Sequence, residues 1–117
     1  MTLPLTKENL QAAYDFLSTT EPFNKWNLPE GDDVVFSVIR DPKLRGYYIF
    51  ENKRHRIYVS ASTIGHTQNL IGVMAHEMIH LHEQEAGMCR QDVEHSAAFK
   101  KLAARVCKIH GFDPKLF

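Results

Sequence analysis

Cysteine is scarce in this chain, with only Cys89 and Cys107 among 117 residues. Two isolated cysteines form neither a disulfide framework nor a Cys-x-x-Cys metal or redox site. The sequence therefore favours a reducing compartment, and we expect a cytoplasmic protein.

Long apolar runs are also lacking. No stretch reaches the roughly 18 consecutive apolar residues of a membrane-spanning helix, so we expect no membrane partner. The first eight residues contain neither a basic segment nor the apolar run that follows it in a signal peptide. Membrane proteins and secreted disulfide scaffolds are thus the first classes that the sequence excludes.

Charge of one sign is not in excess, because 14 Lys and Arg balance 14 Asp and Glu. A net charge of zero gives no general electrostatic argument for nucleic-acid binding. From residue 100 onward five basic residues stand against a single acid. We interpret this segment as a solvated helix face, with a weak anion-binding patch as the alternative. The length predicts one domain over residues 1–117.

Histidine, in contrast, is abundant, and its arrangement in residues 73–82 is the centre of the sequence. His76-Glu77-x-x-His80 matches a pattern in which two histidines lie one helical turn apart on the same face. His76 and His80 can therefore bind one metal ion through their ring nitrogens. Glu77 is offset by one position, where a carboxylate can act on a metal-bound water as general base and then general acid. Zinc suits this set because it takes neutral imidazoles and keeps one position open in catalytic sites.

A catalytic zinc ion needs a third protein ligand. His82 is about 200° round the helix from His80 and faces away, while Glu83 would strain a tetrahedral site from the same helix. His95 stands at the start of a second helical pattern, from which a ligand can approach in another direction. We predict His95 as the third ligand of one zinc ion per chain, with Cys89 or an acidic residue as the alternative.

Apolar periodicity, caps and turn residues divide the chain into helices and strands. The predicted elements are a helix over residues 7–18, a loop over 19–33, strands over 34–39, 47–50 and 56–60, a helix from a cap at residue 67 to residue 83 or 85, and a helix over 97–110. We therefore expect an α+β fold with an N-terminal helix, a small three-stranded sheet, the helix that carries the motif and a C-terminal helix. Trp26, in the predicted loop, is interpreted as a core anchor, with a substrate contact as the alternative.

The third predicted strand, over residues 56–60, directly precedes the helix with the motif. We predict that it is an edge strand beside the metal, to which an extended substrate adds through main-chain hydrogen bonds; an interior position is the alternative. Asp92 and Glu94 are interpreted as solvated loop charges, with orientation of ligand histidines as the alternative. Candidates for stabilising the oxyanion, which the sequence does not rank, are Tyr47, Tyr58, His66 and Arg90.

These motifs and their spacing resemble a known family. The pattern at His76–His80, fourteen intervening residues and then His95-Ser-Ala-Ala-Phe99 with a basic-apolar helix resemble the SprT-like zinc metallopeptidases. The predicted strands before the motif are also similar to those of that family, so the resemblance covers most of the chain. Ser96 stands where the family usually has glycine, and serine is a good N-cap for a helix that begins at Ala97.

The resemblance implies a zincin-like fold, zinc bound by His76, His80 and His95, and Glu77 as the catalytic acid and base. It also implies an association with DNA, although the net charge of zero gives no support for DNA binding. Many family members carry a Cys-rich zinc ribbon after this domain. The sequence shows no Cys pair before its last residue, Phe117, so we expect a minimal catalytic domain.

We predict a zinc metallopeptidase that hydrolyses peptide bonds in a protein or peptide substrate. Two other classes are compatible with the sequence. One is a metal-binding module for protein interaction without turnover, which a fourth protein ligand such as Cys89 would favour. The other is a metal-dependent hydrolase that acts on a bond other than a peptide, because the ligand set alone does not define the bond.

Overall fold

The computed structural model describes residues 5–62, 67–87, 95–115 and 117. Within these residues the chain has the predicted α+β composition, with three α-helices and one three-stranded sheet. The helices and strands are α1 (Lys7–Ser18), β1 (Val34–Ile39), β2 (Gly46–Glu51), β3 (Arg54–Ser60), α2 (Thr67–Glu85) and α3 (Ala97–His110). No helix in this part of the chain is both long and apolar enough to cross a membrane.

The helix ends follow local sequence signals. The side chain of Thr6 accepts a hydrogen bond from the Asn9 amide at the start of α1, as predicted. Gly111 follows α3 with a φ of 77°, a conformation that favours glycine, and its amide donates to the Cys107 carbonyl. The predicted cap at Thr67 is wrong by one position, because Thr67 is the first helical residue of α2.

The sheet has the order β1-β3-β2, so β3 is its central strand. It pairs with β1 in parallel and with β2 in antiparallel orientation. The prediction that residues 56–60 form an edge strand is therefore wrong. Ile57 and Val59 are fully buried on one face of β3. A central strand places such a face farthest from solvent while both neighbours satisfy its main chain.

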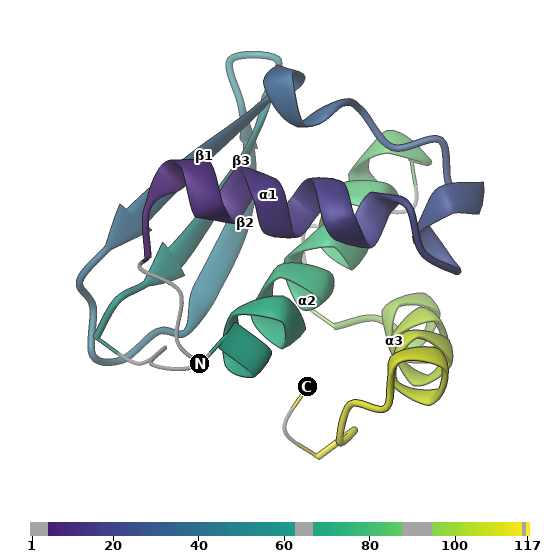
Figure 1. Ribbon diagram of the computed structural model, residues 1–117. Coiled ribbons are helices and arrows are strands. Elements are labelled where there is room, and N and C mark those ends of the chain that lie inside the picture. The colour runs from purple at the N-terminus through teal and green to yellow at the C-terminus, as the bar shows by residue number, and fades with distance from the viewer. Residues whose placement is uncertain (1–4, 63–66, 88–94, 116) are drawn as a thin grey trace.

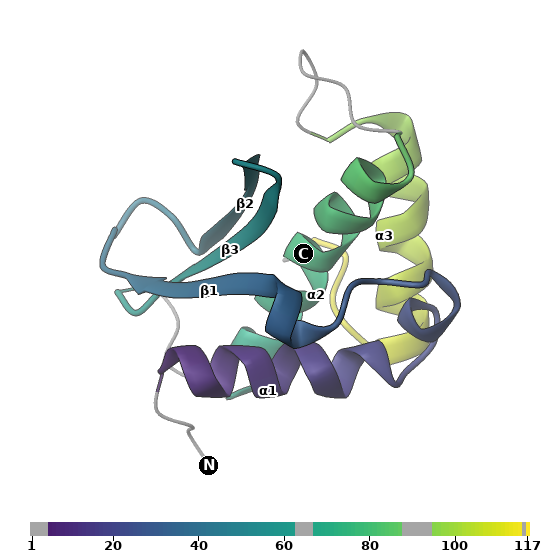
Figure 2. The ribbon, with the colours of Figure 1, turned by 90° about the horizontal axis from the view of Figure 1, so that it is seen from above.

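Helix α2 lies between the sheet and α3 (Figure 2), while α1 crosses β1 and also packs against α2 (Figure 1). Apolar residues of α2 therefore face several neighbouring elements, and the helix is buried round most of its circumference. Its buried apolar residues are Leu70, Val73, Met74, Ala75, Met78, Ile79 and Leu81. The residues of the His-Glu-x-x-His pattern are thus carried by the central helix of the core.

Two contacts fix the second half of α2. His55, a buried residue of β3, donates a hydrogen bond from Nε2 to the Glu85 carboxylate and accepts one at Nδ1 from the Tyr48 hydroxyl. On another side, the His82 ring stacks on Trp26 with ring centres 4.2 Å apart. Trp26 also packs edge-on against the buried Phe23, so its predicted role as a core anchor is confirmed.

Candidate metal centre

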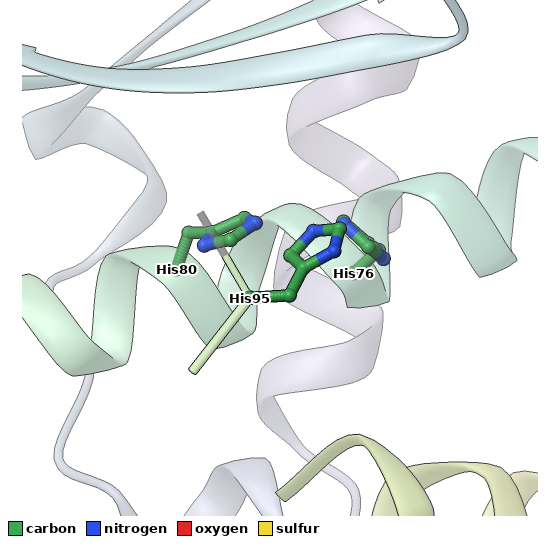
Figure 3. Close-up of side chains that lie close together, drawn as sticks. All are labelled: His76, His80 and His95. Atoms are coloured by element: carbon green, nitrogen blue, oxygen red, sulfur yellow. The ribbon is translucent and has the colours of Figure 1, made fainter. Parts of the chain in front are cut away.

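Three histidines from two segments lie together beside the core. His76 and His80 project from α2, and His95 comes from the segment just before α3 (Figure 3). Each offers one ring nitrogen, and these nitrogens all lie within 4.8 Å of one another. Zinc–nitrogen bonds are about 2.0–2.1 Å long, so two nitrogens on one ion lie at most about 4.2 Å apart. The three rings are therefore close to the spacing that one ion requires, and a small inward shift of the side chains would complete it.

Phe99 and Ser96 place His95 opposite α2. The Ser96 hydroxyl caps α3 by accepting a hydrogen bond from the Phe99 amide at 3.1 Å. The Phe99 ring, buried one turn into α3, packs against His76, His80 and His95, with ring centres 4.4 to 5.0 Å away. The start of α3 therefore supplies both the third imidazole and an apolar backing for the cluster.

The electrostatics of the cluster favour neutral imidazoles. Burial, with a further contribution from His95, lowers the pKa of His76 to about 4. Burial and the two neighbouring histidines lower the pKa of His80 to about 3. Both rings are thus neutral at pH 7, with a lone pair available to a metal ion.

Glu77 is buried, with 4% of its surface exposed, next to the start of β2. The backbone of Gly46 approaches α2 so closely that a Cβ built there would lie 3.5 Å from Glu77 Oε2 and 2.9 Å from Val73 Cγ1. Glu77 and His76 line one cavity of about 300 Å³. The carboxylate is therefore held at the wall of a pocket that borders the histidine cluster.

A second carboxylate lies next to the cluster, at His80 and Ser96. Glu83 is buried in the last turns of α2, with Oε1 3.9 Å from His80 Nδ1. Its Oε2 accepts a hydrogen bond from the Ser96 hydroxyl at 3.3 Å. Glu83 thus connects a histidine of α2 to the residue that follows His95. The sequence contains a signal for this contact, because Glu83 stands three residues after His80 and therefore lies on the same helix face.

Other predicted candidates lie elsewhere. His82 faces away from the cluster, as predicted, with its ring on Trp26. Tyr47 and Tyr58 stack on each other across β2 and β3, 4.4 Å apart. Both alternate with inward-facing residues, so they lie on the sheet face turned away from α2. The remaining candidates, His66, Cys89, Arg90, Asp92 and Glu94, fall outside the described residues.

The segment after α3 forms part of the pocket wall. Phe112 and Phe117 pack against the core, and the Phe117 ring centre lies 5.3 Å from that of His76. A hydrogen bond that the His76 ring donates to the main-chain carbonyl of Phe117 partly offsets the lowering of the histidine pKa. Arg45, just before β2, lies at the same pocket and repels a charged His76 ring.

Comparison with known proteins gives one match. A family model described as the SprT-like family matches residues 14–116, a range that includes the three histidines and Glu77. No curated protein and no solved structure matches the chain.

Proposed function

The chain belongs to the SprT-like family, and from this premise we propose that it is a zinc-dependent metallopeptidase of zincin-like fold. The family itself indicates a metallopeptidase-like domain, as the sequence motifs predicted. The observation that carries the finer proposal is the set of three imidazole nitrogens within 4.8 Å of one another, beside the buried carboxylate of Glu77. We propose His76, His80 and His95 as the zinc ligands.

The donor set fits zinc. Three imidazoles, two of them neutral because of burial, are the ligand set of a well-known class of catalytic zinc sites. Among the described residues, no Cys, Asp or Glu joins this group as a fourth ligand. Three protein ligands with one position for water or substrate is the arrangement of catalytic zinc sites, and it is the arrangement that we propose here.

Glu77 performs the proton transfers in this proposal. Zinc at such a site supplies a Lewis acid that polarises a peptide carbonyl and lowers the pKa of water toward about 7. The Glu77 carboxylate accepts a proton from the attacking water while the water oxygen bonds to the carbonyl carbon. It then donates this proton to the leaving amine nitrogen as the peptide bond breaks.

Strand β2 takes the place of β3 as the proposed docking edge for the substrate. The Arg45 carbonyl accepts a hydrogen bond from the Ser60 amide, so in this antiparallel pair the main-chain groups of Gly46 point away from β3. No other strand of the described residues pairs with that side of β2. An extended peptide added there would pass Gly46, next to Glu77.

The proposal is tested with the purified, zinc-loaded protein and a mixed peptide library read by mass spectrometry. We expect cleavage of internal peptide bonds, loss of cleavage after zinc is removed by a chelator, and recovery when zinc is restored. Zinc binding without cleavage of any peptide or unfolded protein would favour the interaction module. Turnover of an ester or phosphodiester in place of peptides would favour the other hydrolase class.

We also expect Glu83 to orient the ligands. Replacing Glu83 with alanine removes the carboxylate that faces His80 Nδ1 and accepts from Ser96, so zinc affinity should fall about 10- to 100-fold. Competition with a chromophoric chelator measures this affinity directly. Ser96→Gly is the matched comparison, because it removes the hydroxyl and leaves the carboxylate. If Glu83→Ala bound zinc with unchanged affinity, Glu83 would contribute only to packing and not to the orientation of the ligands.

A further inference from the structure

The pocket beside Glu77 is unusually rich in glycine. It lies between the start of β2, the first half of α2 and the segment after α3, and its volume is about 300 Å³. The whole chain has 6 glycines. Three of them, Gly46, Gly72 and Gly111, line this one cavity.

Two of these glycines are required by the fold. Gly111 has a φ of 77° where α3 ends, a conformation that other residues rarely adopt. Gly46 lies so close to its neighbours that a Cβ there would meet the Tyr58 carbonyl oxygen at 2.7 Å. Their places at the pocket therefore need no functional explanation.

Gly72 has no such requirement. It lies inside α2, and, apart from its chain neighbours and the backbone of its own helix, no described atom lies within 4 Å of a Cβ built there. Glycine in a helix interior destabilises the helix relative to alanine, because it loses more conformational freedom on folding. The packing of the fold would therefore accept a larger residue. Because Gly72 has no side chain, the space beside it, one helical turn before His76, is part of the pocket.

We propose that this pocket receives a large apolar side chain of the substrate, on the residue next to the scissile bond, and that Gly72 sets the depth of the pocket. The inference rests on the peptidase function proposed above. The position next to the scissile bond follows because His76 and Glu77, the proposed ligand and proton carrier, form one wall of the cavity.

The walls indicate the class of side chain. Val73, Phe112 and Phe117 supply apolar surface, and Arg45, Asn69 and Asp113 add polar groups to the wall of the same cavity. An apolar cavity of about 150 Å³ holds a benzene molecule. The larger volume here therefore suits an aromatic ring or a long aliphatic chain, whose burial is favourable in proportion to its apolar area.

The test compares the wild type with Gly72→Ala and Gly72→Leu on the mixed peptide library, and then on synthetic peptides that differ only in one residue beside the cleaved bond. We expect the wild type to prefer Phe, Tyr, Leu or Met at that residue. Gly72→Leu should lower the ratio of kcat/KM for Phe over Ala by at least about tenfold. Gly72→Ala should lower it less and raise the melting temperature by about 4 °C through better helix propensity.

Ala104→Leu is the control, because it places the same leucine side chain at an exposed position of α3 outside the pocket. The ratio of kcat/KM for Phe over Ala should be the same in this variant as in the wild type. An active Gly72→Leu with an unchanged Phe over Ala ratio would overturn the inference and leave the peptidase proposal standing. An equal fall in kcat/KM on all peptides in both Gly72 variants would also overturn the inference. A wild type that cleaves nothing would reject the proposed function, and this inference with it.

Discussion

Replacing Glu77 with glutamine is expected to abolish peptide hydrolysis while zinc stays bound. The amide keeps the size of the side chain in its buried place against β2, but it cannot accept a proton from water. Loss of a general base costs up to about 10,000-fold, and we expect at least about 1,000-fold in kcat. The measurement is the single-turnover rate on a peptide that the wild type cleaves, together with zinc content by elemental analysis.

A matched control is Glu8→Gln, which makes the same chemical change at an exposed position in the first turn of α1. It should retain both zinc and the wild-type rate. Turnover of Glu77→Gln at the wild-type rate would show that another group carries the proton. Loss of zinc in Glu77→Gln would show that the carboxylate supports the metal site rather than the chemistry.

His95→Ala is the second variant with a large expected effect. Removing one of three ring nitrogens leaves His76 and His80 as the remaining pair of the cluster. We expect zinc affinity to fall by more than about 100-fold, because even the loss of a partner that only orients a ligand costs up to that amount. Zinc stoichiometry after dialysis and competition with a chelator measure the effect without any substrate.

His82→Phe tests whether the effect belongs to the cluster and not to histidine in general. His82 lies on the same helix as His80 but stacks on Trp26, and phenylalanine keeps a ring in that place. This variant should bind one zinc ion per chain. If His95→Ala bound zinc as tightly as the wild type, the third ligand would be Cys89 or a carboxylate instead of His95. That result would remove the main support for the three-histidine proposal.

Local signals made most element boundaries predictable. Thr6 and Ser96 cap their helices through hydrogen bonds within three residues, and Gly111 ends α3 through its own backbone conformation. The spacing of His76 and His80 likewise places them on one helix face whatever the tertiary structure. Such features depend on nearby residues, and they can be inferred from the sequence without knowing what packs where.

Features that need partners distant in sequence could not be predicted in this way. The β2–β3 hairpin is local, but β1 joins the far side of β3 across the whole hairpin, and nothing in residues 34–39 specifies that neighbour. Glu83 acquires its place because Ser96 folds against it from another segment. The outward direction of Tyr47 and Tyr58 follows from the close packing of Gly46 on α2, which the sequence does not display.

The division of the cluster between α2 and the start of α3 has a thermodynamic consequence. A ligand that binds only the assembled site stabilises the folded state by an amount that grows with the logarithm of its concentration, about 2.7 kcal/mol at one hundred times the dissociation constant. Small proteins are stable by only about 5–15 kcal/mol. A zinc ion held by all three histidines would therefore act as a reversible cross-link, and part of the stability of the α2–α3 packing would vary with the supply of metal.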